Sequence, residues 1–379
     1  MSDDFKDRLE RYDKGEMTPE EKMEFEKEMS AQEKQWMKPT LEKTKQRKIL
    51  RASKWKARIG TALTAIPILL LIMMASSFVT TIYYHGFSKG LSEDYTRSQK
   101  LADIINFSLL ITDPFAEKYG ADTEVGTFFK MGVDKELRKQ VGKEFYTVGE
   151  MNVDFLFSKM GSVEKRYYGT DEDSLTEFQH PSLLSEYKFD STPEWERLEM
   201  LPEGTVATAF ITFNELMSTE KVFEQFKGKD LELIWFPVDV AGEVDDYHSI
   251  SNIGFPNYPI FHTDDWTLTS RTEERSLFAS TITEGRSAPA YTIGDADMLH
   301  EQFLKTLHFL KDYQKEFNQL QVMHNDIELI EVVRYLEKND ISHHGVVITG
   351  PTKEVLSLKS EKWIGAIQVD EVALWNWSN

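Results

Sequence analysis

Cysteine is absent from the sequence, and one stretch of it lacks charge. Because none of the 379 residues is a cysteine, disulfide bonds and metal sites built on thiolates are excluded. Although 28% of the chain is charged, Ile59–Tyr84 contains no Asp, Glu, Lys, Arg or His. This stretch therefore differs in kind from the sequence on either side of it.

The uncharged stretch predicts a single transmembrane helix. The hydrocarbon core of a bilayer needs about 20 helical residues, and Ile59–Tyr84 is longer than that. Trp55 precedes it and Tyr83 and Tyr84 close it, as expected of aromatic anchors at the two interfaces. A cleaved signal peptide starts close to the N-terminus and has a shorter apolar stretch, and a buried core helix would be interrupted sooner by polar residues. We therefore expect residues 59–84 to anchor the chain in the lipid bilayer.

Basic residues lie on the N-terminal side of this helix. Residues 39–58 form a basic juxtamembrane segment whose one acid is Glu42, whereas residues 85–91 offer only Lys89. Since positive charge stays inside, we expect a cytoplasmic N-terminus and an extracellular C-terminal domain. The residues that determine this topology are Lys43, Lys45, Arg47, Lys48, Arg51, Lys54, Lys56 and Arg58.

The negative charge lies beyond the membrane helix. The chain has a net charge of −20, yet residues 1–58 carry more basic than acidic side chains. The exported part is therefore strongly acidic, which argues against direct binding to nucleic acid and against adsorption on an anionic lipid surface. An exported domain of this size without disulfides is more typical of a bacterium than of a eukaryotic secretory pathway.

Residues 1–38 read as two short amphipathic helices. The first carries one apolar stripe, and the second begins with a capping box in which Thr18 is the N-cap and Glu21 the third helical residue. Gly15 is a natural stop between them, and Pro39 is expected to end the second. The apolar side chains on the two stripes are Phe5, Leu9, Tyr12, Phe25, Met29 and Trp36.

Two such stripes are too small to make a stable core alone. We therefore interpret residues 1–38 as a helical segment that orders on a partner protein, with its six apolar residues as anchors. The alternative is that the segment packs on itself or on the membrane as an inert tail.

Tyr12–Met29, YDKGEMTPEEKMEFEKEM, resembles the N-terminal anti-sigma domain of bacterial transmembrane anti-sigma factors. Zinc-binding members of that group have a His-x-x-x-Cys-x-x-Cys set of ligands. The corresponding positions here are Glu28, Gln32 and Gln35, so the resemblance implies a member without zinc. No metal and no other cofactor is expected.

The exported part is predicted to be an α+β domain. Residues 85–112 read as a membrane-proximal helix, with an amphipathic pattern from Leu91 to Thr112, and Asp113-Pro114 marks a turn before a domain at 113–379. Within that domain we expect two long helices, at Asp295–Leu320 and Asp326–Asn339, and several strands. The strands are expected at Phe145–Val148, Asp154–Phe157, Val206–Phe213, Leu231–Val240, Gly345–Thr349 and Trp363–Trp375.

Two parts of this domain follow the same order of elements. A strand at Val206–Phe213 leads into a short helix at Ser218–Phe226 and a second strand, and the pattern returns 133 positions later. Thr219 then aligns with Thr352 and Val222 with Val355. This alignment suggests a duplicated strand–helix–strand unit.

The C-terminal run HGVVITGPTKEVLSLKSEKWIGAIQVDEVALWNW, together with FITFNELMSTEKVFEQF, resembles the C-terminal sigma-factor-regulator domain of Gram-positive anti-sigma-M-type proteins. The resemblance implies a short cytoplasmic segment, one membrane helix and this exported domain. It also implies that the chain sequesters an extracytoplasmic-function sigma factor at the membrane, often together with a small membrane protein.

No enzyme motif appears in the exported part. His300 and His308 lie eight residues apart on one predicted helix, but a hydrogen-bonded or exposed histidine is more common than a ligand. No residue is therefore expected to be catalytic. Two alternatives remain: a membrane-anchored envelope enzyme or ligand-binding protein with an incidental tail, and a subunit that only scaffolds another membrane protein.

Overall fold

The structure is a computed structural model of the chain. It describes residues 3–86, 95–117, 121–169, 178–184, 190–240, 253–275, 280–321 and 327–377. The chain divides into two compact units, Met1–Ala75 and Ser76–Asn379, and each is described by itself.

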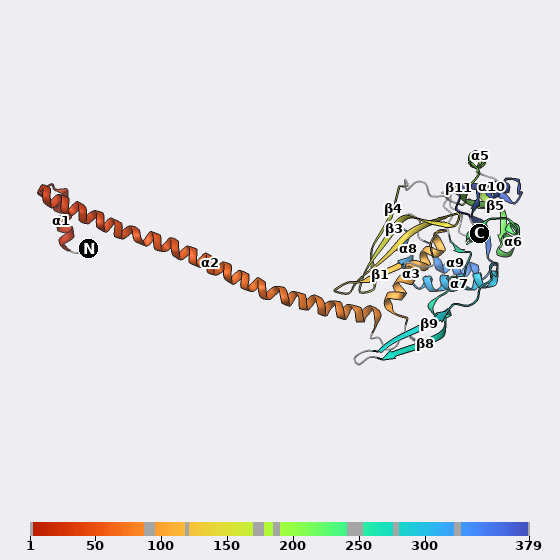
Figure 1. Cartoon of the computed structure of the whole chain (residues 1–379), viewed down its shortest axis with the longest axis horizontal. Helices are drawn as coiled ribbons and strands as arrows, with labels where there is room; N and C mark the ends of the chain where they lie inside the picture. Colours follow the sequence, from red (N-terminus) through yellow and green to blue (C-terminus); the bar gives the residue numbers. More distant parts are fainter. Residues whose placement is uncertain are drawn as a thin grey trace. The chain divides into compact units, whose positions relative to one another are not determined.

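The first unit holds helix α1 (Asp3–Asp13) and most of helix α2 (Pro19–His85), which Figure 1 draws in red and orange. The expectation that Pro39 ends the second helix is wrong, because α2 continues through Pro39 as one helix of 67 residues. A proline removes one main-chain hydrogen bond and crowds the preceding turn, but the Lys, Glu and Gln residues around Pro39 are strong helix formers.

The second unit begins with the last turns of α2 and continues into helix α3 (Arg97–Thr112). α2 stops at Gly86, which has a φ of +76°. α3 starts at Thr96, whose hydroxyl and main chain form a capping box with Gln99. The expected start of this helix at Leu91 lies outside the described residues.

α3 lies at the centre of this unit. Its buried side chains Ile104 and Ile105 pack in one apolar cluster, and Phe107 and Leu110 pack in another. The sequence suggested a boundary at Asp113-Pro114. α3 packs with the strands that follow this turn, and both lie in the compact unit Ser76–Asn379.

Four antiparallel strands form the first sheet, sheet A, in the order β1-β2-β3-β4. The strands are β1 (Ala121–Val125), β2 (Lys130–Val141), β3 (Glu144–Leu156) and β4 (Lys159–Tyr167). Met131, Val133, Met151 and Val153 alternate with exposed or half-buried residues and pack with α3. One face of sheet A is therefore apolar, as the period of two requires.

Five antiparallel strands form the second sheet, sheet B, in the order β11-β5-β10-β6-β7. They are β5 (Thr205–Ser218), β6 (Glu232–Pro237), β7 (Gly254–Pro256), β10 (Ser342–Pro351) and β11 (Ile364–Leu374). The central strand β10 is buried from His343 to Pro351, and β5 is buried from Thr205 to Phe213. Their buried residues are mostly apolar, but they include polar side chains such as Thr208, Thr349 and His343.

Sheet B contains the suggested duplication. β5–α6–β6 and β10–α10–β11 have the same order of elements, with α6 at Thr219–Phe226 and α10 at Thr352–Ser357. β5 and β10 pair antiparallel at the centre, and each outer strand pairs with the central strand of the other unit. The two units therefore exchange their outer strands about the central pair.

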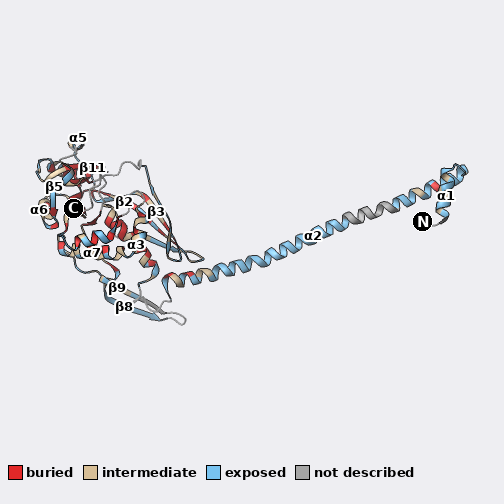
Figure 2. Ribbon diagram, turned by 180° about the vertical axis from the view of Figure 1, so that it is seen from behind, coloured by how far each residue is buried: buried red, intermediate tan, exposed pale blue. Residues whose placement is uncertain are grey.

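The remaining elements cover sheet B or extend from it. α7 packs with α9 and α3, and their buried residues belong to the larger apolar cluster; Figure 2 shows the buried stripes of α3 and α7 in red. The hairpin β8–β9 extends away from the body in Figure 1, and β8 is exposed throughout. These elements are α4 (Pro181–Leu184), α5 (Thr192–Met200), η1 (Thr263–Asp265), β8 (Thr267–Arg275), β9 (Ser280–Ser287), α7 (Ala296–Lys311), α8 (Gln314–Leu320), α9 (Leu329–Leu336) and η2 (Leu358–Ser360).

A buried set of hydrogen bonds joins sheet A to sheet B. The Thr208 hydroxyl donates to the main-chain oxygen of Gln140 at 2.8 Å, and the Gly142 N–H donates to the Thr349 hydroxyl at 2.7 Å. Gly142 has a φ of +66°, and a Cβ there would collide with the side chain of Asn376. The β2–β3 turn is therefore fixed against sheet B.

The α+β class is confirmed, and so are most of the predicted elements of sheet B. The sequence missed β1, β2, β4, β7, β8 and β9, and it divided β3 into two strands. The helix expected at Asp295–Leu320 is broken between α7 and α8.

Buried histidines predict acid sensitivity of the second unit. Burial lowers the pKa of His343 and of His344 to about 3, well below the usual value of about 6.5. The unfolded chain therefore takes up protons first as the pH falls below about 6.5. The free energy of unfolding therefore keeps its full value above that pH, and at about pH 5 it is lower by about 2 kcal/mol for each of these histidines.

Urea unfolding of the detergent-solubilised chain measures this loss of free energy of unfolding. Unfolding is followed by near-UV circular dichroism, once above about pH 6.5 and once at about pH 5. His344→Leu should reduce the pH dependence, because it removes one of these two buried histidines. Equal stability of the parent at the two pH values would contradict the prediction.

Candidate functional site

The first unit is a helical hairpin whose turn follows the sequence signals. Gly15 has a φ of +67° and ends α1. The Thr18 N–H donates to Glu21 Oε2 at 2.9 Å, and the Glu21 N–H donates to the Thr18 hydroxyl at 3.4 Å. The predicted capping box is therefore confirmed. The main-chain N–H and the hydroxyl of Thr18 both donate to the Glu21 carboxylate, and they lower its pKa below the usual range.

Phe25 is the centre of this hairpin. Its side chain is fully buried, and the rings of Phe5 and Tyr12 on α1 lie 5.2 and 5.5 Å from its ring centroid. The guanidinium of Arg8 lies 5.4 Å from the same centroid. One aromatic side chain of α2 therefore fills the space beneath α1.

Polar contacts surround the aromatic centre. Arg8 pairs with Glu28 at 3.0 Å, and the Tyr12 hydroxyl donates to Glu26 at 2.6 Å. The hydrogen bond to the Glu26 carboxylate raises the pKa of Tyr12. These pairs were not predicted, although Arg8 and Tyr12 lie one turn apart on the face of α1 that carries Phe5.

The structure brings together most of the six apolar residues predicted to bind a partner. Phe5, Leu9, Tyr12 and Met29 are half-buried, so each still presents part of its side chain, whereas Phe25 is in the interior. Trp36 lies on α2, and its side chain is outside the described part. Met23, on the other side of α2, is 71% exposed and takes no part.

The basic juxtamembrane segment and the uncharged stretch are consecutive parts of α2. Within the described residues, one part of α2, Lys45–His85, is long and apolar enough to cross a membrane. Leu63, Leu70 and Phe78 expose more than half of their side chains. A helix with apolar side chains on all sides is suited to lipid.

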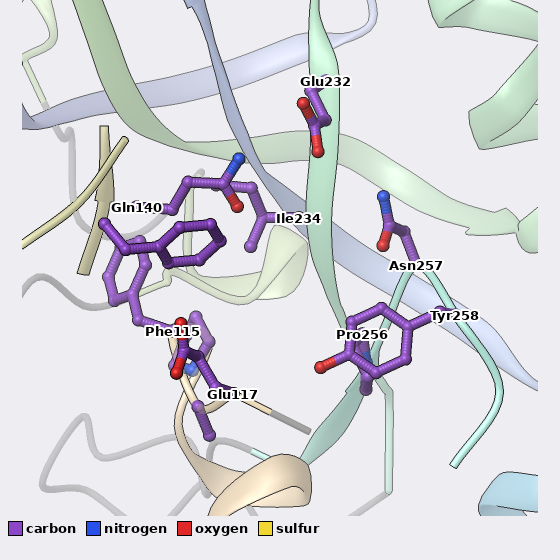
Figure 3. A pocket seen from close by; sticks show the side chains of 11 residues that line it. Phe115, Glu117, Gln140, Glu232, Ile234, Pro256, Asn257 and Tyr258 are labelled. Carbon is purple, nitrogen blue, oxygen red and sulfur yellow. The ribbon is translucent and has the colours of Figure 1, made fainter. Parts of the chain in front are cut away.

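The second unit has a cavity of about 390 Å³ beside sheet B, shown in Figure 3. Two carboxylates lie in its wall, and both are paired, Glu117 with Arg138 at 3.3 Å and Glu232 with Lys143 at 2.8 Å. The volume is at the lower end for small-molecule sites. The lining residues are Pro114, Phe115, Ala116, Glu117, Gln140, Phe145, Glu232, Ile234, Pro256, Asn257 and Tyr258.

The described residues contain no group of three or more His, Asp or Glu side chains placed to hold a metal ion. His300 Nε2 lies 2.6 Å from the Thr219 hydroxyl, and His308 Nε2 lies 3.2 Å from Glu337. Both histidines therefore have protein partners, as the sequence analysis expected. The six apolar residues of the hairpin remain the candidate site.

Two regions of the chain match known families of regulatory domains. Residues 47–146 match the sigma factor regulator N-terminal domain, and residues 198–371 match the sigma factor regulator C-terminal domain. The chain therefore belongs to the sigma factor regulator family, which is regulatory and not enzymatic. Residues 1–46, which include α1 and the start of α2, lie outside both matched regions.

One relative matches along the whole chain. The "Probable anti-sigma-M factor YhdL" of Bacillus subtilis (strain 168) is 26% identical over 393 aligned residues, which cover 100% of both chains. No solved structure matches the chain.

The packing of Phe25 makes a prediction about the hairpin. Phe25→Ser should release α1 from α2, because it removes the one fully buried ring between them. The main-chain amides of α1 should then exchange with deuterium at least about tenfold faster, corresponding to a loss of more than about 1.4 kcal/mol. Hydrogen-exchange mass spectrometry on the full chain in detergent measures this, with Met23→Ser as the matched control. Equal exchange rates in the two variants would contradict the role of Phe25.

Proposed function

We propose that this protein is an anti-sigma factor, a membrane-bound negative regulator that sequesters an extracytoplasmic-function sigma factor through its N-terminal hairpin. Membership of the sigma factor regulator family supports a sigma factor as the partner. The observation that favours the hairpin as the binding element is its apolar face. Four side chains there are only half-buried by the hairpin itself.

Phe25 and its neighbours have different roles in this proposal. Phe25 orders α1 against α2, and Leu9, Tyr12 and Met29 form the apolar anchor surface with Phe5 and Trp36. Acidic side chains such as Glu26 and Glu28 surround that surface. They would meet a basic surface of the sigma factor, which favours fast and specific association. The hairpin would thereby cover surfaces that the sigma factor uses to bind RNA polymerase.

The membrane arrangement follows from α2. The protein crosses the bilayer once at residues 59–84, with residues 1–58 in the cytoplasm and the domain from residue 85 onward on the extracellular side. The exposed apolar side chains of Ile59–Val79 and the basic residues before them support this topology. A small membrane protein is a further partner that the family resemblance implies.

The cavity beside sheet B favours a second function for the exported part. A membrane-anchored ligand-binding protein would use this cavity and would not need residues 1–38. Deletion of residues 1–38 distinguishes the two functions, because it abolishes sigma-factor control in the first case and leaves ligand binding unchanged in the second.

A pull-down with residues 1–58 as bait tests the leading proposal. The bait should retain one of the sigma factors of the source organism. Leu9→Asp combined with Trp36→Asp should weaken that binding by about 30-fold or more, since loss of an interface anchor typically costs at least about 2 kcal/mol.

Met23→Asp, on the opposite side of α2, is the matched control and should bind as the parent does. Retention of no sigma factor, or equal retention by the double variant, would contradict the proposal.

A further inference from the structure

Two hairpin turns of sheet A have an unfavourable backbone and five-residue sequences that are identical at four positions. The β1–β2 turn leads into Phe-Phe-Lys-Met-Gly at 128–132, and the β3–β4 turn leads into Phe-Ser-Lys-Met-Gly at 157–161. Phe128, Phe129, Phe157 and Ser158 have φ values of +54°, +60°, +50° and +60°. Two-residue hairpin turns of this kind usually carry Asn or Gly. Something other than turn preference therefore selects phenylalanine here.

The turn at the other end of sheet A provides a comparison. The β2–β3 turn has a glycine, Gly142, at its position of positive φ and is fixed against sheet B. The β2–β3 turn thus uses glycine, whereas the two turns with phenylalanine leave Phe128 50% and Phe157 52% exposed. Large exposed aromatic side chains at strained turns indicate a binding surface.

The end of α2 holds both turns in place. The main-chain N–H of Phe128 donates to the Ser76 hydroxyl at 2.7 Å, and that of Phe129 donates to the Thr80 hydroxyl at 3.0 Å. The Tyr84 hydroxyl donates to the main-chain oxygen of Phe129 at 2.9 Å and accepts from the Ser158 N–H at 3.3 Å. Both turns are therefore attached to the last three turns of the helix.

Helix length places this attachment at the outer membrane boundary. The apolar run begins after Arg58, and the hydrocarbon core takes about 20 helical residues. The run therefore leaves the hydrocarbon close to Ser76 and Ser77, where Phe128 is bonded. Tyr83, whose ring centroid lies 5.3 Å from that of Phe129, follows within the interfacial layer.

The charge of the two turns also fits a position at the membrane boundary. Lys130 and Lys159 follow the turns directly and are exposed. Gly132 lies two residues further from the β1–β2 turn than Lys130 does. Its partners on the neighbouring strands are Glu124 and Asp154, the nearest acidic side chains there. The turns are therefore apolar and basic in a unit that is otherwise acidic, and this combination suits lipid headgroups.

We propose that the two turns form a membrane foot: Phe128 and Phe157 insert into the outer interface of the bilayer, and Lys130 and Lys159 contact lipid phosphates. The foot fixes sheet A on the membrane beside α2, so the exported unit has one defined orientation. This inference rests on the proposed membrane crossing by α2.

Site-directed spin labelling tests the foot directly, because the chain has no native cysteine. The full chain, in vesicles of phosphatidylethanolamine and phosphatidylglycerol, receives a nitroxide at Phe128→Cys or Phe157→Cys. Phe145→Cys is the matched control, since Phe145 is also 50% exposed and lies at the other end of β3. Leu70→Cys reports on the membrane crossing itself. Circular dichroism confirms that each variant is folded.

We expect collisions with a water-soluble nickel reagent to be several-fold rarer at residues 128 and 157 than at residue 145, and collisions with oxygen to be more frequent. Labels at 128 and 157 as water-accessible as at 145, with Leu70 still in lipid, would overturn the foot and leave the membrane crossing intact. A water-accessible label at residue 70 would instead overturn the crossing. If 128 and 157 are shielded in native membranes but not in pure lipid, a protein covers them and the foot is wrong.

A second pair of substitutions separates the side chains from the turn. Phe128→Asn with Phe157→Asn keeps the positive φ, which asparagine tolerates better, and removes the apolar groups. A nitroxide at Thr127→Cys should be shielded in the parent and become several-fold more accessible to the nickel reagent in the double variant. Unchanged accessibility would contradict insertion of the two rings.

Discussion

The hydrogen bonds between the end of α2 and the turns of sheet A are the constraint on which the second unit depends. Ser76, Thr80 and Tyr84 supply side chains that satisfy main-chain groups of both turns. The last turns of α2, from Ser76 to His85, are therefore part of the second unit. The division between the units at Ala75/Ser76 expresses the same fact.

Sheet A connects this attachment to sheet B. β2 and β3 leave the end of α2 and reach sheet B through the turn at Gly142, where Thr208 and Thr349 hold it. α3 runs inside the unit and contributes to both apolar clusters. β2, β3 and α3 therefore connect sheet B with the last turns of α2 inside the second unit.

The sequence predicted the parts whose physical signal is local. The capping box at Thr18, the stop at Gly15 and the buried strands β5 and β10 all have short-range signatures, and the structure confirms them. Sheet A was harder, because β2 and β4 are rich in charged residues and one of the buried side chains of β2 is Lys135. The path of α2 through Pro39 was not predictable either, since one proline can be tolerated when its neighbours favour the helix. In the hairpin, spacing identified the apolar stripe, but only packing distinguishes Phe25 in the interior from Leu9 and Met29 at the surface.

The central claim is that the hairpin restrains a sigma factor, and a transcriptional reporter in the source organism tests it most directly. A reporter for the sigma-dependent regulon should rise strongly when the gene for this chain is deleted. It should return to its resting level when the full chain is restored, but not when a chain lacking residues 1–38 is restored. An unchanged reporter in the deletion strain, or full restoration by the shortened chain, would contradict the account.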